Sequence, residues 1–141
     1  MASERIFLPD DDATAALGAR LAGELKPGDL VLLTGGLGAG KTALARAIIR
    51  TLVGDAGLDV PSPSFALVQP YEANGVPVLH ADLYRLREAR EIDELGLFER
   101  ADAIVLVEWP ERAHELLSRA SMVVTIEVPA DGMGRVVEIA R

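Results

Sequence analysis

The residues best suited to chemistry in this sequence form a glycine-rich segment that ends in a lysine and a threonine. Residues 35–42 read GGLGAGKT, which fits the phosphate-binding pattern G-x-x-x-x-G-K-[ST]. Glycines let backbone N–H groups surround an anion, because a Cβ would block the approach or forbid the dihedral angles. We therefore expect a nucleoside triphosphate to bind this segment, which consists of Gly35, Gly36, Leu37, Gly38, Ala39, Gly40, Lys41 and Thr42.

The last two residues of this segment have separate roles in such a site. Lys41 offers a mobile cation to the β- and γ-phosphates, and the Thr42 hydroxyl is a suitable ligand for Mg²⁺, which prefers oxygen donors. The chain has only two lysines, Lys26 and Lys41, against twelve arginines. One of the two stands where a point charge suits phosphate better than a planar guanidinium. The alternative is a glycine-rich turn between a strand and a helix, with no ligand.

An acidic residue at the end of a short apolar run is the second candidate. Residues 104–107 read IVLV, and Glu108 follows them. Phosphate-loop enzymes place a carboxylate at the carboxyl end of a buried strand to hold Mg²⁺ or to orient water. We expect one of these roles for Glu108, although an acid at a strand end can also simply face solvent.

Residues 80–85, HADLYR, follow another expected strand and offer three further candidates. Asp82 is expected to approach the metal, directly or through water, if that strand lies beside the loop. His80 shares a strand face with Asp82, so it is a candidate to bond a phosphate or the attacking water; the alternative is a core histidine bonded to a carbonyl. Arg85 either neutralises charge on the γ-phosphate or is one of several exposed arginines.

A turn with two hydroxyl groups precedes these strands. Residues 62–65 read SPSF. The Ser64 hydroxyl is a candidate for contact with Mg²⁺ or with water beside the γ-phosphate. Taken alone, the motif indicates only a turn that opens a strand.

The elements that must position these side chains follow from the hydrophobic pattern. Strands are predicted at 5–8, 30–33, 65–71, 76–80, 103–107, 122–128 and 136–140, with a hairpin turn at 74–75. Helices are predicted at 13–25, 42–51, 88–95 and 111–117. This order favours an α/β fold of the P-loop NTPase type: a central mixed sheet, parallel around the loop, with helices on both faces and antiparallel additions.

Composition limits the classes of function. The length of 141 residues predicts one domain, and because half of the residues are hydrophobic, disorder is disfavoured. Together with the glycine-rich segment, this gives an expected single P-loop ATPase domain over residues 1–141. The net charge of −8 disfavours direct binding of nucleic acid, so any RNA is expected to be held by a partner protein. The absence of cysteine rules out disulfides and fits a cytoplasmic protein. We expect neither a signal peptide in residues 1–12 nor a membrane span.

Taken together, these segments resemble the TsaE (YjeE) family of bacterial ATPases in tRNA threonylcarbamoyladenosine biosynthesis. The resemblance covers nearly the whole chain and is carried by Thr14, Leu17-Gly18 and residues 28–29, 37–42, 62–65, 80–85, 95–96 and 108–109. In two places the chain departs from the family: Gly36 stands where the family usually has an acid, and Ser64 replaces a threonine. Ser64 keeps the hydroxyl, whereas Gly36 loses a charge. We expect weaker or differently tuned turnover, with binding retained.

The resemblance implies ATP and Mg²⁺ binding with slow intrinsic hydrolysis. It also implies two partner subunits, of the TsaD and TsaB type, that transfer a threonylcarbamoyl group to adenosine 37 of tRNA, so that tRNA is reached only through the partners. The positions that match the family's phosphate and metal ligands are Lys41, Thr42, Asp82 and Glu108. Tyr84 and Trp109 match the nucleotide pocket or the partner face, and Asp11, Thr14 and Arg135 match positions beside the base.

Two other classes of protein stay open. A small-molecule kinase would use the same loop, but it needs a second substrate pocket and usually an arginine-bearing lid. The lid candidates are Arg85, Arg87 and Arg90. A GTPase-like switch would need the guanine-reading motif Asn-Lys-x-Asp, whereas the only asparagine, Asn74, is followed by Gly75.

Overall fold

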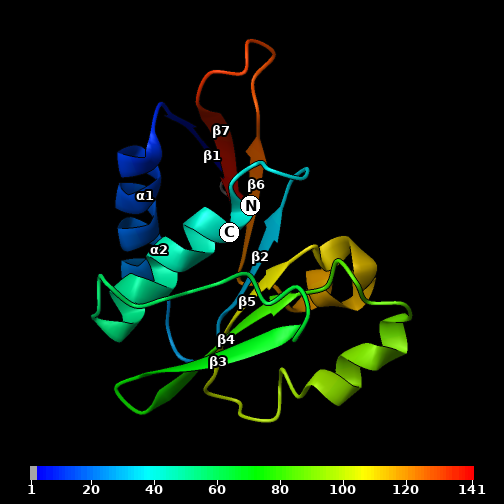
Figure 1. Cartoon of the computed structure of the whole chain (residues 1–141). Coiled ribbons are helices and arrows are strands. Elements are labelled where there is room, and N and C mark those ends of the chain that lie inside the picture. Colours follow the sequence, from blue (N-terminus) through cyan, green and yellow to red (C-terminus); the bar gives the residue numbers. More distant parts are fainter. Residues whose placement is uncertain (1–2) are drawn as a thin grey trace.

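The computed structural model describes residues 3–141, and one mixed sheet runs through it (Figure 1). The sheet has seven strands in the order β1-β7-β6-β2-β5-β4-β3. In chain order they are β1 (Ser3–Leu8), β2 (Leu30–Thr34), β3 (Val68–Ala73), β4 (Val76–Asp82), β5 (Ile104–Glu108), β6 (Met122–Glu127) and β7 (Arg135–Ala140). Strands β6, β2, β5 and β4 are parallel, while β1, β7 and β3 pair antiparallel at the two ends. The predicted mixed sheet with antiparallel additions is confirmed.

The buried central strands explain why the sheet is covered on both sides. Residues 30–33 of β2 and all of β5 are buried, as is typical of parallel strands with packing on each face. The β3–β4 hairpin turns through Asn74 and Gly75, whose φ angles of 51° and 83° suit a two-residue turn.

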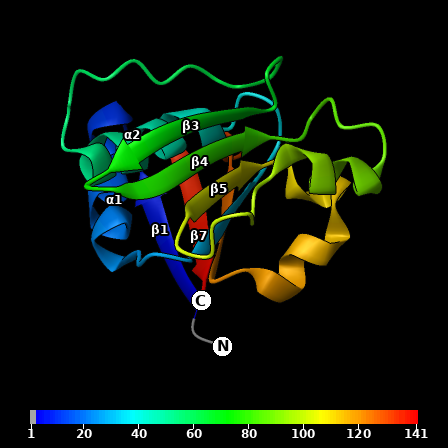
Figure 2. The same ribbon diagram turned by 90° about the horizontal axis from the view of Figure 1, so that it is seen from below.

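Two α-helices cover one face of the sheet, and short 3-10 helices cover the other (Figure 2). Helix α1 (Asp11–Glu24) packs on α2 (Lys41–Val53), and both contribute to the larger core cluster. The helices cross closely at Gly18, where a Cβ would lie 2.3 Å from the Ala47 Cβ. Among residues 3–141, no helix has both the length and the apolar composition needed to cross a lipid bilayer.

Short 3-10 helices occupy the second face. The helix predicted at 88–95 is confirmed as the 3-10 helix η1 (Ala89–Leu95), whereas the one predicted at 111–117 is divided into η2 (Pro110–Arg112) and η3 (His114–Arg119). Ala113 separates the last two with φ −144°, so neither segment is long enough to repay the cost of starting an α-helix.

The strand predicted at 65–71 was also wrong at its start, because β3 begins at Val68. Leu67 has φ +68°, and its N–H donates to Pro63 O over 2.7 Å. Residues 64–66 therefore form a turn before the strand.

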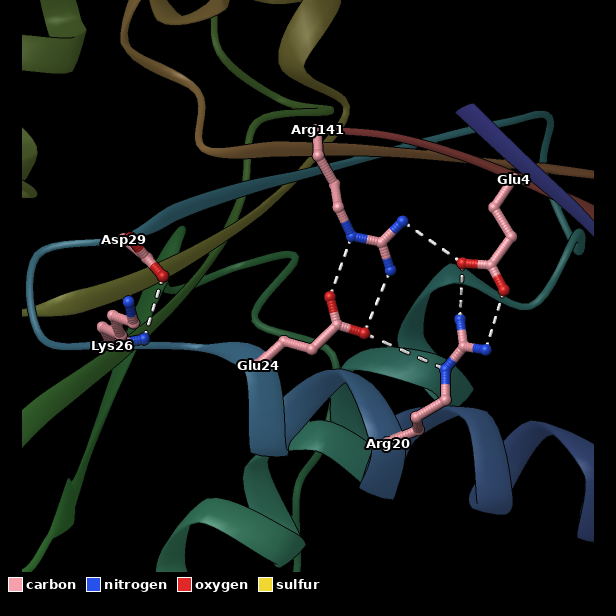
Figure 3. Close-up of polar contacts among 6 residues, drawn as sticks. All are labelled: Glu4, Arg20, Glu24, Lys26, Asp29 and Arg141. Atoms are coloured by element: carbon pink, nitrogen blue, oxygen red, sulfur yellow. Dashed lines mark hydrogen bonds and ion pairs between the residues drawn. The ribbon is translucent and has the colours of Figure 1, made fainter. Parts of the chain in front are cut away.

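Alternating charges tie the end of α1 to the β1–β7 end of the sheet (Figure 3). Arg20 in α1 donates to both oxygens of Glu4 in β1 over 2.7 and 2.8 Å. Arg141, which follows β7, lies 2.8 Å from Glu24 and 3.2 Å from Glu4. The paired geometry makes this network a better anchor than an isolated surface ion pair.

The network predicts an acid-dependent loss of stability. Hydrogen bonding from Arg20, helped by Arg141, holds the pKa of Glu4 below its ordinary value. A carboxyl whose pKa is lowered by folding stabilises the protein above its unfolded pKa, and this contribution disappears as pH falls through the folded pKa. We expect Glu4→Gln to lower the free energy of unfolding at pH 7, and we expect its difference from wild type to shrink below about pH 5. Urea unfolding followed by circular dichroism measures both.

The matched control is Glu138→Gln, because Glu138 makes one exposed ion pair, with Arg5. A difference between wild type and Glu4→Gln that stays constant from pH 7 to pH 3 would contradict the assignment.

Candidate functional site

The glycine-rich segment forms the loop between the carboxyl end of β2 and the amino end of α2 (Figure 1). Helix α2 begins at Lys41, with Gly40 as its N-cap, so the positive end of the helix dipole faces the loop. Gly38 and Gly40 have φ angles of +74° and +108°, which residues with a Cβ rarely adopt. The loop therefore has the shape and the N–H donors that anion binding requires.

The Lys41 ammonium is held at this loop by three contacts. Its Nζ donates to Gly35 O over 2.6 Å and to Gly36 O over 2.8 Å, and it lies 4.0 Å from the centroid of the Trp109 ring. Burial lowers the pKa of Lys41, an effect that the Glu108 carboxylate and its neighbours oppose. The cation is thus positioned and partly stripped of water, which strengthens its attraction for a phosphate.

Glu108 lies beside Thr42 and His80 in a buried polar cluster. The Thr42 hydroxyl donates to both Glu108 oxygens over 2.8 and 3.0 Å. His80 Nε2 lies 2.6 Å from Glu108 Oε2, and both side chains are buried. Within residues 3–141, His80 Nδ1 has no hydrogen-bond partner. The partner of His80 is therefore the Glu108 carboxylate and not a backbone carbonyl. His80 does not line the cavity described below.

Strand register brings these groups together. Parallel pairing of β4 and β5 sets Asp82 opposite Glu108 and His80 opposite Leu106. Alternate residues of a strand share one face, and this face carries the core cluster to which α2 belongs. The two carboxylates and the histidine therefore lie below the amino end of α2.

Asp82 is fixed by neighbours on both sides. Its Oδ1 accepts from the Tyr84 N–H over 2.9 Å, and its Oδ2 accepts from the Ser62 hydroxyl over 3.2 Å. The Ser62 contact joins the SPSF turn to the end of β4. The sequence predicted a role for Ser64 in this turn, but it did not predict the hydrogen bond from Ser62.

A cavity of 390 Å³ opens over these groups. Its lining includes most of the predicted site: Leu37, Gly38, Ala39, Gly40, Lys41, Thr42, Ser64, Asp82, Glu108 and Trp109, together with Ala43, Ser62 and Tyr84. Arg85 is not part of this lining, and its guanidinium lies 4.3 Å from the centroid of the Phe65 ring.

A second cavity, of 170 Å³, adjoins the other side of the loop. Asp11, Thr14 and Arg135 line it, together with Ala39 and Gly40, which the two cavities share. The structure therefore brings the positions expected beside a base to the rim of the loop.

Trp109 has a backbone conformation that the sequence did not signal. It follows Glu108 with φ +58°, in the left-handed region that is strained for a bulky residue. Its ring packs on Tyr84 at a centroid distance of 4.9 Å and lies against the Lys41 ammonium. The strained backbone carries an aromatic wall to the edge of the loop.

The oxygen donors of this site suit a magnesium ion that is bound partly by protein groups and partly by phosphate oxygens. Residues 3–141 contain no cluster of three or more histidine, aspartate or glutamate side chains arranged to hold a metal. The Thr42 hydroxyl and the Glu108 carboxylate are hard oxygen donors 2.8 Å apart. Mg²⁺ commonly takes one or two such protein ligands and completes its shell with phosphate oxygens and water.

Two glycines of the loop are expected to respond oppositely to alanine. Gly36 has no positive φ, and a Cβ there would meet nothing within 4 Å. Gly38 also has open space, but its φ is +74°. We expect Gly36→Ala to raise the free energy of unfolding by about 0.4–1 kcal/mol, and Gly38→Ala to lower it by about 1–2 kcal/mol.

Urea denaturation of both variants checks this prediction. Equal changes in the two variants would show that the backbone angle at residue 38 does not distinguish the sites.

Comparison with known proteins points to one family. The family model described as "Threonylcarbamoyl adenosine biosynthesis protein TsaE" matches residues 8–136. The tRNA threonylcarbamoyladenosine biosynthesis protein TsaE of Rickettsia felis is 40% identical over 124 residues, which cover 87% of this chain and 72% of that protein. The protein of the same name in Rickettsia bellii is 36% identical over 132 residues, covering 93% and 91%. That of Synechocystis is 40% identical over 122 residues, covering 83% and 76%.

A solved structure is similar over almost the whole chain. The crystal structure of Bacillus subtilis YdiB superposes with a TM-score of 0.73 at 24% identity, covering 98% of this chain and 84% of that one. This likeness establishes the fold.

Proposed function

The chain belongs to the TsaE family of threonylcarbamoyl adenosine biosynthesis proteins, and we propose that it is a P-loop ATPase that supports formation of N6-threonylcarbamoyladenosine at position 37 of tRNA. Family membership supports the role in tRNA modification. The observation that carries the ATPase activity is the arrangement of Lys41 and the Thr42–Glu108 pair around the 390 Å³ cavity. We also propose a cytoplasmic location.

ATP binding would use the loop, with a division of labour between its parts. The N–H groups of the loop and of the first turn of α2 would surround the phosphates. Lys41 would exchange its bonds to Gly35 O and Gly36 O for bonds to phosphate oxygens. The base would lie toward the 170 Å³ cavity lined by Asp11 and Thr14.

Hydrolysis would be an in-line attack of water on the γ-phosphate. Asp82 and Glu108 line the cavity and can orient that water. His80 would hold Glu108 in place through the 2.6 Å contact. Thr42 and Glu108, with Asp82 directly or through water, would hold Mg²⁺, which when bound neutralises charge on the phosphates.

The nucleotide state would set affinity for partner subunits of the TsaD and TsaB type. The Ser62–Asp82 hydrogen bond and the Arg85–Phe65 stacking contact join the SPSF turn to the segment after β4. Both segments can therefore respond together to the γ-phosphate. The net charge of −8 supports contact with tRNA through the partners.

Nucleotide titration tests this proposal. Trp109 is the only tryptophan and contacts Lys41, so Mg·ATP is expected to change the intrinsic fluorescence saturably. GTP is expected to bind more weakly than ATP in the same titration. Slow ATP hydrolysis that rises when the partner subunits are added would support the function.

Two results would count against it. Failure to bind ATP in calorimetry would overturn the ATPase activity. Hydrolysis stimulated by a metabolite pool and unaffected by partner proteins would favour a small-molecule kinase.

A further inference from the structure

The guanidinium of Arg135 contacts carbonyl groups of the phosphate loop, although the two lie far apart in the sequence. Arg135 is the first residue of β7, and antiparallel pairing pairs it with Leu8 of β1. Its Nε donates to Ala39 O, 96 residues away, over 3.0 Å, and its Nη2 donates to Gly38 O over 3.3 Å. Nη1 donates to Gly134 O over 2.6 Å. Each guanidinium nitrogen thus meets a backbone carbonyl.

These contacts orient two peptide units of the loop. In a trans peptide the C=O and the following N–H point in opposite directions. With Gly38 O and Ala39 O turned toward Arg135, the N–H groups of Ala39 and Gly40 are turned away from it. The Ala39 N–H closes a turn onto Gly36 O over 3.2 Å. Within residues 3–141 the Gly40 N–H has no backbone partner, and Gly40 lines the 390 Å³ cavity.

The loop needs such a restraint because of its own glycines. Gly38 and Gly40 have no Cβ, so the peptide units between them can rotate among several conformations. A loop that binds phosphate through its N–H groups binds more tightly when those groups are set beforehand, since ordering then costs less on binding. The planar fork of an arginine presents its N–H donors in a fixed geometry, so one side chain can hold two carbonyls in a defined relative orientation.

We infer that Arg135 is a positioning residue that presets the peptide orientation of the phosphate loop; this inference rests on the ATP site proposed above. Arg135 also lines the 170 Å³ cavity, where it was expected to flank the base. Its nitrogens are directed to loop carbonyls, so its effect reaches the nucleotide through the phosphates.

The test separates a loop effect from a base contact. ATP and inorganic tripolyphosphate, each with Mg²⁺, are titrated by calorimetry into wild type, Arg135→Gln and Arg135→Lys. We expect Arg135→Gln to lower the binding affinity for both ligands by the same factor, about tenfold. This corresponds to the loss of one charge-assisted hydrogen bond. Arg135→Lys is expected to recover part of the affinity for both. Arg5→Gln is the matched control, since Arg5 pairs with Glu138 and makes no bond to the loop.

A second measurement reports on the loop without any ligand. Amide hydrogen exchange at residues 38–40 is expected to be faster in Arg135→Gln than in wild type, with exchange in the rest of the sheet unchanged. If Arg135→Gln fails to fold, Arg135→Lys carries the same comparison, because it keeps the charge and loses the fork.

Several outcomes would overturn the inference. If Arg135→Gln has a lower affinity for ATP and an unchanged affinity for tripolyphosphate, Arg135 contacts the base. Unchanged affinity for both ligands, in a wild type that binds them, would remove Arg135 from the loop while leaving the ATP site intact. A wild type that binds neither ligand would overturn the ATP site, and the inference with it.

Discussion

Lys41→Ala is expected to reduce ATP affinity at least about 100-fold, because it removes a charge that would make charge-assisted bonds to phosphate in a partly dehydrated site. The ammonium already lies within 2.8 Å of two loop carbonyls and 4.0 Å from the Trp109 ring centroid. The ammonium is therefore already at the loop, and on ATP binding it is expected to exchange these two hydrogen bonds for bonds to phosphate oxygens. Calorimetry with Mg·ATP measures the loss directly.

Lys26→Ala is the control for this substitution. Lys26 is the only other lysine and is exposed in the turn before β2. It is expected to bind ATP as wild type does, and urea unfolding of both variants shows whether each is folded. An unchanged ATP affinity in a folded Lys41→Ala protein would count against the site.

Glu108→Gln is expected to leave ATP affinity within about threefold of wild type and to lower kcat about 10²–10³-fold. Glutamine has the same shape, so it can still accept from Thr42, but it cannot supply a full negative charge. An interaction that matters mainly in the transition state appears in kcat more than in ground-state binding. Binding by calorimetry and single-turnover hydrolysis of ATP separate the two quantities.

Glu111→Gln is the matched control for Glu108→Gln. Glu111 is an exposed acid three residues further along, and its carboxylate accepts a long hydrogen bond of 3.4 Å from the Thr34 hydroxyl. It is expected to hydrolyse ATP at close to the wild-type rate. If Glu108→Gln does the same, Glu108 has no part in the reaction.

The two substitutions together distinguish ways in which the site can fail. If Lys41→Ala loses ATP binding and Glu108→Gln loses turnover, the protein is an ATPase in which the two residues have separate roles. If Lys41→Ala loses ATP binding but Glu108→Gln still hydrolyses ATP, the water-orienting role would belong to Asp82, which lies opposite Glu108 in the sheet.

The errors in predicting the fold came from segments without strong periodicity. The helix predicted at 111–117 is divided at Ala113 into two 3-10 helices, each of which is short and is held by packing of a few apolar side chains on the sheet. The strand predicted at 65–71 starts late because Leu67 takes a left-handed conformation that no residue type announces.

Features that depend on neighbours in the chain could be read from the residues alone. The pattern of residues 35–42 specifies a loop because glycine has unusual dihedral freedom wherever it occurs. Alternation within β4 was enough to put His80 and Asp82 on one face. The Asn74-Gly75 pair was enough to predict a hairpin.

The partners of the site residues depend on the folded sheet. His80 meets Glu108 across 28 residues, and Arg135 meets Ala39 across 96. Such pairs form only after strand order and register are established by packing, and a one-residue shift in register would turn each side chain to the opposite face. Local patterns do not determine which distant strands become neighbours, so these contacts could be found only in three dimensions.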